Sequence, residues 1–140
     1  MRNKIYFGHP INTYGTPLES RLLTEIALAF PEWEIENPNQ EYHQKGCRGC
    51  EAEGGNPMEY FFDEVLPDCR AGIFLPFRDG MWGYGVFSEA IVLREQECPI
   101  WEISPDGTIV PIMDLDGDLE LSIEETLARI LTSLGETIPY

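Results

Sequence analysis

Basic residues are scarce in this sequence. Nine Lys and Arg stand against 25 Asp and Glu, which gives a formal net charge of −16 at pH 7. A field of that sign repels phosphate backbones and slows the approach of polyanions. The composition therefore excludes nucleic-acid polymers as partners, whereas a small neutral metabolite meets no such repulsion.

Long hydrophobic runs are also lacking. No apolar stretch approaches the roughly 18 residues that a membrane-spanning helix needs. Residues 1–4 lead directly into a strand-like run rather than into the apolar core of a signal peptide. We therefore expect no membrane partner and a cytoplasmic location.

Cysteine is sparse, and of the four residues only Cys47 and Cys50 lie close together in the sequence. Without an export signal these cysteines are expected to be thiols. With His43 the pair has the residue types of a zinc site, but a structural zinc needs a fourth ligand and the chain has no second close pair. Ordinary loop thiols are favoured over a zinc site or a redox-active pair, and neither a metal nor a cofactor is predicted.

Acidic residues at Asp114, Asp116 and Asp118 have the alternating spacing of a calcium loop. Such a loop needs glycine at its sixth position for the sharp bend, and Leu119 stands there, while Gly117 is at the fourth. The pattern is therefore interpreted as a solvated acidic turn before a capped helix.

Strand-like and helix-like patterns alternate through most of the 140 residues, a length that suits one domain. Strands are predicted at 4–8, 33–36, 71–77, 99–103 and 108–112, and helices at 18–30, 57–66, around Glu89 to about 96, and from the cap at Ser122 to Gly135. Residues 39–56 are predicted to form a long surface loop. The order predicts one α/β domain, residues 1–140, built as a three-layer sandwich with a mostly parallel twisted sheet and an antiparallel edge strand.

Residues 83–93 turn a glycine-rich loop into an apolar helix and leave one carboxylate, Glu89, near the join. In an open α/β sheet this loop lies at the carboxyl end of a strand, where such sheets bind ligands. Gly83 and Gly85 let backbone N–H groups approach a ligand, and the helix start adds the positive end of its dipole. Glu89 is either an acid that complements this dipole or a group that points at the bound ligand.

Two short motifs stand at the ends of predicted strands: Tyr6-Phe7-Gly8-His9-Pro10, and Gly85-Val86-Phe87-Ser88-Glu89-Ala90 followed by Cys98-Pro99-Ile100. Together they resemble the nucleoside 2-deoxyribosyltransferase family over residues 4–103. In that family the first strand ends in a Tyr-x-x-Gly-Pro-like pattern, and a later Gly-x-x-x-Glu opens a helix that leads to a Lys-Pro-hydrophobic strand. The resemblance implies a flavodoxin-like fold and a glutamate nucleophile that takes the sugar from a purine or pyrimidine base. By position, Glu89 corresponds to that nucleophile and Tyr6 to the hydroxyl that holds it.

The chain departs from the family pattern at two positions. The family usually has an Asp two residues before the motif glycine, where this chain has Gly83, and a small residue where this chain has His9. Asp79, four residues before Gly83, is the candidate to reach the same pocket from its loop. The residues expected to contact the substrate are Gly8, His9, Pro10, Asn12, Gly83, Gly85 and Ser88.

The chemistry of N-glycosidic cleavage explains why these residue types matter. The sugar develops oxocarbenium character, so a carboxylate beneath the anomeric carbon stabilises the charge or attacks it, and a second acid protonates the departing base. Glu89 suits the first role, and Asp79 or His9 suits the second. A hydrogen bond from Tyr6 is expected to keep Glu89 ionised. Asp79 and Glu89 are predicted to converge at about 5 Å, as in retaining glycosidases, with either water or a second base accepting the sugar.

Two alternatives use the same loop. Residues 82–85 followed by Glu89 also resemble the Gly-Gly-x-Gly-Thr-x-x-Glu loop of the phosphoribohydrolases that release cytokinin bases from nucleotides, with Trp82 and Val86 as departures. The other alternative is a domain without catalysis that only binds a nucleotide-like ligand, which the missing Asp at Gly83 favours. In each case the expected partner is a small-molecule nucleoside or nucleotide, and a homo-oligomer is possible.

Overall fold

The computed structural model describes residues 2–40, 43 and 57–140. Within them, the parallel strands β1 (Lys4–Gly8), β2 (Glu34–Glu36), β3 (Cys69–Phe74) and β4 (Ile100–Ile103) form one sheet with the antiparallel strand β5 (Ile109–Pro111) at its edge. The strand order is β2-β1-β3-β4-β5, which is the flavodoxin-like order. The predicted α/β class, with a mostly parallel sheet and an antiparallel edge strand, is confirmed.

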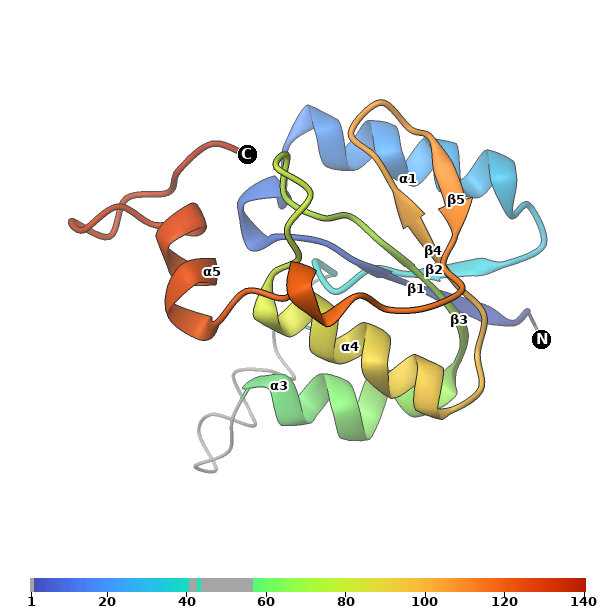
Figure 1. Cartoon of the computed structure of the whole chain (residues 1–140). Helices are drawn as coiled ribbons and strands as arrows, with labels where there is room; N and C mark the ends of the chain where they lie inside the picture. The colour runs from blue at the N-terminus through green and yellow to red at the C-terminus, as the bar shows by residue number, and fades with distance from the viewer. Residues whose placement is uncertain (1, 41–42, 44–56) are drawn as a thin grey trace.

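Helices cover both faces of the sheet (Figure 1). The helix α1 (Pro17–Ala29) lies on one face, and α3 (Pro57–Tyr60) and α4 (Tyr84–Glu95) lie on the other. Side chains alternate along β1, so Ile5 and Phe7 pack with the α1 layer while Tyr6 packs with the α4 layer. This alternation turns the Tyr6 side chain toward the helix that carries Glu89.

The segment after α3 departs from a regular helix. A single helix was predicted over 57–66, whereas the structure has α3, then a π-helix at Phe61–Val65 and a 3₁₀ turn at Leu66–Asp68. Single π-helical turns are uncommon and occur frequently near functional sites. Here the π-helix begins at Phe61, which packs edge-on against Tyr6 with 6.4 Å between ring centroids.

The third strand is shifted toward the N-terminus relative to the prediction of 71–77. It begins at Cys69 and ends at Phe74. One further ladder bond, from the Leu75 N–H to the Gly8 carbonyl, follows. Pro76 then has no N–H to donate, so the pairing stops and the chain turns.

The last helix, α5 (Ile123–Ile130), begins as predicted but ends earlier. Ser122 and Glu125 form the expected capping box, with each side chain bonded to the other residue's backbone N–H. Gly135 does not end the helix, because Leu131 is already extended. Gly135 instead closes a turn at φ +80°, donating to the Thr132 carbonyl. The α5 helix lies beyond the carboxyl ends of the parallel strands, and the segment after it projects to one side (Figure 1).

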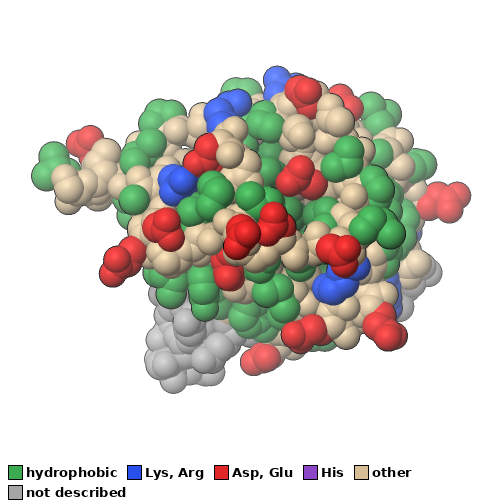
Figure 2. Space-filling view, in the orientation of Figure 1, with side chains coloured by type: hydrophobic (Ala, Val, Ile, Leu, Met, Phe, Trp, Pro, Cys, Tyr) green, Lys and Arg blue, Asp and Glu red, His purple; other side chains and the backbone are tan. Residues whose placement is uncertain are grey.

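Acidic side chains are spread over the face seen in Figure 2, with few basic ones among them. This distribution follows from the net charge of −16. Among the helices of the described segments, none combines the length and the apolar character that crossing a membrane requires.

Candidate functional site

A cavity of about 380 Å³ lies at the carboxyl ends of β1 and β3. Much of its wall comes from the loop after β1, the α3 segment with Phe61, the first half of α4 and the inner side of α5, and Tyr6, Pro38 and Phe77 complete it. Most of the wall is apolar or aromatic, with rings from Tyr6, His9, Tyr14, Phe61 and Phe77. Such a lining with a few polar groups is typical of a small-molecule site.

Glu89 is buried in the wall of this cavity, in the second turn of α4. The Tyr6 hydroxyl donates a hydrogen bond to Glu89 Oε2, as expected from the sequence. Tyr6 is fully buried, and its ring is fixed by contacts with Phe61 and Phe74. The strand therefore presents one rigid donor to one carboxyl group.

Burial dominates the ionisation of this pair. It raises the pKa of Glu89 from 4.5 to about 8, although the hydrogen bond from Tyr6 opposes the shift. Burial beside Glu89 also raises the pKa of Tyr6 well above its ordinary value, so Tyr6 remains a neutral donor. The expectation that Tyr6 keeps Glu89 ionised is corrected, because desolvation of the carboxylate outweighs one hydrogen bond.

The glycines of the two motifs have different positions. Gly83 and Gly85 line the cavity together with Pro10 and His9, as predicted. Gly8 lies behind the wall, where an added Cβ atom would stand 2.5 Å from the Phe74 ring and 3.4 Å from Glu89 Oε1. Gly8 thus leaves room for the Phe74 ring and the Glu89 carboxyl group rather than forming a surface for the ligand.

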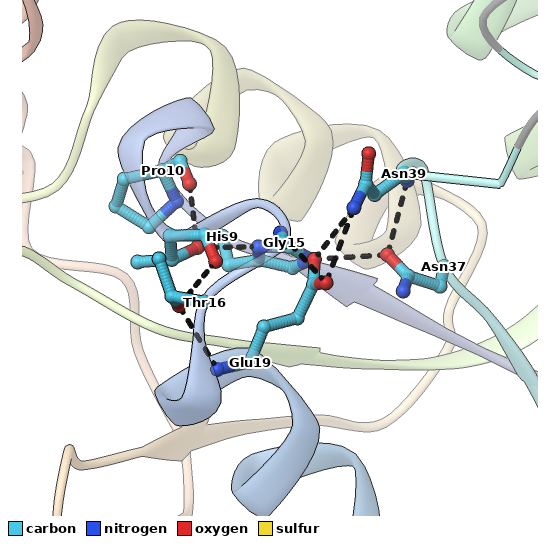
Figure 3. Close-up of polar contacts among 8 residues, drawn as sticks. His9, Pro10, Gly15, Thr16, Glu19, Asn37 and Asn39 are labelled. Carbon is cyan, nitrogen blue, oxygen red and sulfur yellow. Dashed lines mark hydrogen bonds and ion pairs between the residues drawn. The ribbon is translucent and has the colours of Figure 1, made fainter. Parts of the chain in front are cut away.

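His9 lines the cavity with its ring, but both of its nitrogens bond to other protein groups (Figure 3). Nδ1 lies 2.8 Å from Thr13 Oγ1, and Nε2 lies 3.1 Å from Asn37 Oδ1 and 3.5 Å from Glu19 Oε2. Asn37 Oδ1 also accepts from the Asn39 N–H, so it is the amide oxygen, and His9 Nε2 carries a proton toward it. Burial lowers the pKa of His9 to about 4, which leaves the ring neutral at pH 7. His9 is therefore a neutral ring, held in the cavity wall by these contacts.

The sequence reasoning missed the buried carboxylate of Glu19. It accepts hydrogen bonds from the Gly15 N–H at 3.1 Å and from Asn39 Nδ2 at 3.1 and 3.3 Å (Figure 3). These contacts join the loop after β1 to the end of β2. A helical acid close to a helix start gives little sequence signal, because the same pattern also describes an exposed residue.

Asp79 does not line the cavity, and the prediction that it converges with Glu89 on one pocket is wrong. Its side chain is half exposed, and its Oδ2 lies 2.7 Å from Arg129 Nη2. Oδ1 accepts from the Met81 N–H at 3.1 Å, which holds the carboxylate in the turn of its own loop. Of the described residues that line the cavity, Glu89 is the only acid.

Asn12 and Ser88 are also placed away from the cavity wall. Asn12 Nδ2 donates to the carbonyls of Arg129 and Ile138, at 3.2 and 2.9 Å, and so ties the loop after β1 to α5 and to the segment beyond it. The Ser88 hydroxyl donates to the Tyr84 carbonyl at 2.8 Å, one turn back along α4. Their predicted roles in substrate contact are corrected, because neither residue lines the cavity and both Asn12 Nδ2 and the Ser88 hydroxyl bond to backbone carbonyls.

Several wall residues were not predicted as part of a site. Tyr14 lies between the predicted strand at 4–8 and the predicted helix at 18–30, Met58 and Phe61 lie in the predicted helix at 57–66, and Thr126 and Ile130 lie in the predicted last helix. Apolar periodicity marks residues that are buried, but it does not distinguish a core from a cavity wall.

Cys47 and Cys50, the residues of the proposed zinc or redox pair, lie outside the described residues. His43, their possible partner, is buried and lies 2.5 Å from Glu36 Oε1 through Nε2 and 2.8 Å from the Tyr60 hydroxyl through Nδ1. In the acidic turn, Asp116 accepts from the Asp118 N–H at 2.9 Å and caps the 3₁₀ turn Gly117–Leu119. Across residues 2–40, 43 and 57–140, no group of three or more His, Cys, Asp or Glu is arranged to hold a metal ion.

Comparison with protein-family models, curated proteins and solved structures finds no match for this chain. The functional interpretation therefore rests on the geometry of the Glu89 cavity.

Proposed function

We propose that this protein cleaves the N-glycosidic bond of a nucleoside and passes the sugar to water or to a second base, with Glu89 as the group that meets the sugar. The observation that carries the proposal is the buried Glu89 carboxyl group, held by Tyr6 in the wall of an aromatic cavity. Aromatic rings suit a planar base, and a carboxyl group is the usual protein partner of an anomeric carbon.

The reaction follows from these two groups. Ionised Glu89 attacks C1′ of the sugar while the C1′–N bond breaks, and the base departs with the electron pair of that bond. The base takes its proton from water at the cavity mouth, because the cavity wall in the described segments holds no second acid. Water or a second base then attacks C1′, which releases the sugar and restores the Glu89 carboxylate.

A binding protein without catalysis is the second candidate. It is favoured by the raised pKa of Glu89, which keeps the carboxyl group protonated at neutral pH, and by the position of Asp79 away from the cavity. A protonated carboxyl group donates a hydrogen bond to a ligand but does not attack it. The two candidates share one ligand class and differ only in whether the base is released.

The phosphoribohydrolase alternative has less support. A nucleotide phosphate is usually met by Arg or Lys. Among the described residues of the cavity wall there is neither. A neutral nucleoside fits this lining better than a nucleotide.

Release of free base from a panel of ribo- and deoxynucleosides, measured by chromatography with and without an added acceptor base, tests the proposal. Glu89→Gln should lower the rate at least about 100-fold, because it removes the nucleophile but keeps an oxygen acceptor for Tyr6. Release by the unaltered protein should rise between pH 7 and 9, since Glu89 ionises near pH 8.

Ser88→Ala is the matched control on the same helix, since the Ser88 hydroxyl donates to the Tyr84 carbonyl in its own helix and Ser88 is not among the described residues that line the cavity. It should keep base release within about twofold of the unaltered protein. Saturable nucleoside binding with no base release at any pH would support the binding protein instead. Equal release by Glu89→Gln and the unaltered protein would remove Glu89 from the chemistry.

A further inference from the structure

The α5 helix forms one wall of the Glu89 cavity but buries little of its own apolar surface. Thr126 and Ile130 face the cavity, and Ile130 is 7% exposed. On the outer side, Ile123 and Leu127 are 57% and 50% exposed. Ile130 packs in a small cluster with Phe77 and Leu121, while the other apolar side chains of α5 are exposed. Polar contacts therefore contribute a substantial share of what holds α5 against the cavity.

Besides the bond from the Ile138 N–H to the Ile130 carbonyl at 2.7 Å, α5 is held by three polar contacts from a loop or helix start that borders the cavity. The Tyr84 N–H at the start of α4 donates to Thr126 Oγ1 at 2.9 Å. Asn12 Nδ2 donates to the Arg129 carbonyl at 3.2 Å. Asp79 Oδ2 accepts from Arg129 Nη2 at 2.7 Å and from Nε at 3.3 Å.

Of these three contacts, the one between Asp79 and Arg129 is an ion pair, in which both side chains carry charge. The loop of Asp79 is well placed for this, because the Met81 N–H fixes Oδ1 and leaves Oδ2 directed at Arg129. The Arg129 guanidinium lies over the ring of Phe77, 5.8 Å from its centroid, and Phe77 also lines the cavity. The hydrogen bond from Arg129 holds the pKa of Asp79 below its ordinary value, so the contact is charged at neutral pH.

We propose that Asp79 is a positioning residue, which through Arg129 latches α5 over the cavity and so controls how tightly the cavity retains a nucleoside. This inference rests on the proposed function in taking the cavity as the nucleoside site. It assigns Asp79 a role that requires no contact with the substrate.

Hydrogen exchange of backbone amides tests the latch without any ligand. Asp79→Asn keeps the oxygen that caps Met81 but loses the charge. Exchange in α5, for example at the Thr126 and Leu131 amides bonded to Ser122 and Leu127, should speed up about two- to fivefold, the range expected for a partly exposed ion pair. Arg129→Gln should do the same, and Asp79→Asn should add little in the Arg129→Gln background, because the two changes remove the same contact.

Asp106→Asn is the matched control. Asp106 caps its own turn through the Thr108 N–H at 2.9 Å, as Asp79 caps Met81, but it lies between β4 and β5. Exchange in α5 should not change in this variant. Unchanged α5 exchange in Asp79→Asn, or an equal effect of Asp106→Asn, would overturn the latch.

Kinetics with 2′-deoxyadenosine as the probe separate a latch from a catalytic acid. In Asp79→Asn the KM should rise about two- to fivefold while kcat stays within about twofold, because a looser wall releases the substrate faster. If turnover instead falls by about 100-fold or more while exchange in α5 is unaltered, Asp79 acts on the substrate and the latch is overturned. If the unaltered protein neither binds nor cleaves the probe, the proposed function fails, and the exchange data alone decide whether the latch exists.

Discussion

At the scale of single residues, the buried position of Glu89 determines its protonation state and its effect on the stability of the fold. The carboxyl group is buried, and its hydrogen-bond donor is the neutral hydroxyl of Tyr6 rather than a cation. A buried carboxylate without a cation is expensive, so the folded protein retains a proton that the unfolded chain releases near pH 4.5. Folding stability is therefore coupled to one proton at Glu89.

This coupling predicts how stability depends on pH. Because the folded pKa is raised to about 8, Glu89 destabilises the fold as pH rises from about 4.5 to 8, and the effect is constant above that range. Over the 2.5 units between pH 4.5 and 7 the loss is on the order of 3 kcal/mol, at about 1.4 kcal/mol per unit. Glu89→Gln carries no such proton and should be more stable than the unaltered protein at pH 7 and above.

Urea unfolding of the two proteins between pH 4 and 9 checks this prediction. The difference between their free energies of unfolding is the relevant measure, because His9, with a folded pKa of about 4, titrates in the opposite sense between pH 4 and 6.5. The gap should close toward pH 4.5. A gap that is independent of pH would mean that Glu89 is ionised in the folded protein.

The family resemblance led to the prediction of a contact between Tyr6 and Glu89, which the structure has, whereas the predicted position of Asp79 was wrong. Tyr6 lies inside a strand and Glu89 inside a helix, so period and register fix the direction of both side chains. Asp79 lies in a loop, where its direction depends on the Met81 turn and on Arg129, 50 residues away. No local pattern contains that partner.

At the scale of elements, α4 must approach β3 closely for Glu89 to reach Tyr6. Gly72 lies in β3 beneath α4, and a Cβ atom there would stand 2.5 Å from Leu93 Cδ1 and 2.7 Å from the Phe74 ring. The missing side chain at Gly72 thus lets the helix rest against the sheet. Any enlargement there pushes α4, and with it Glu89, away from β1.

Gly72→Ala should therefore destabilise the fold by about 1–3 kcal/mol, the usual cost of overpacking a core. It should also weaken the Glu89–Tyr6 contact, so that base release falls along with stability. Gly117→Ala is the control, because no atom of the described residues beyond its two chain neighbours lies within 4 Å of the Cβ position there and its φ is not positive. Thermal unfolding of both variants checks the prediction, and equal melting temperatures would show that α4 moves away without cost.

Element type followed from the sequence, whereas some element ends did not. The period of Leu22 and Ile26 in α1 and the alternation along β1 are local signals, and both elements have the predicted type. The end of α5 depends on distant partners, since Asn12 and the Ile138 N–H take its last carbonyls. Gly135 was predicted to end the helix, but the last carbonyls of α5 are already bonded through these tertiary contacts and the helix ends at Ile130.

At the scale of the whole molecule, the acidic excess is poorly compensated by contacts. The described arginines often donate to main-chain carbonyls rather than to side-chain carboxylates, as Arg21 does to Pro105, Arg70 to Pro67 and Arg94 to Ile112. Ion pairs such as Lys4–Glu36 at 3.2 Å and Arg129–Asp79 at 2.7 Å offset only a few of the 25 acids. The remaining carboxylates repel one another in the compact state.

The charge balance decides how salt acts on stability. Salt weakens the exposed ion pairs, each worth about 0–1 kcal/mol, but it also screens the repulsion of 16 excess negative charges over the whole surface. The screening length falls from about 30 Å at 0.01 M to about 10 Å at 0.1 M, so repulsion between distant charges is lost first. We therefore expect the melting temperature at pH 7 to rise with NaCl between 0.01 and 0.3 M, by roughly 3 °C for each kcal/mol gained.

Near the sequence pI of about 4.2 the net repulsion disappears, so the rise should vanish there or reverse as the remaining ion pairs weaken. A melting temperature that falls with NaCl at pH 7 would mean that specific ion pairs, and not net repulsion, dominate the electrostatics of this fold.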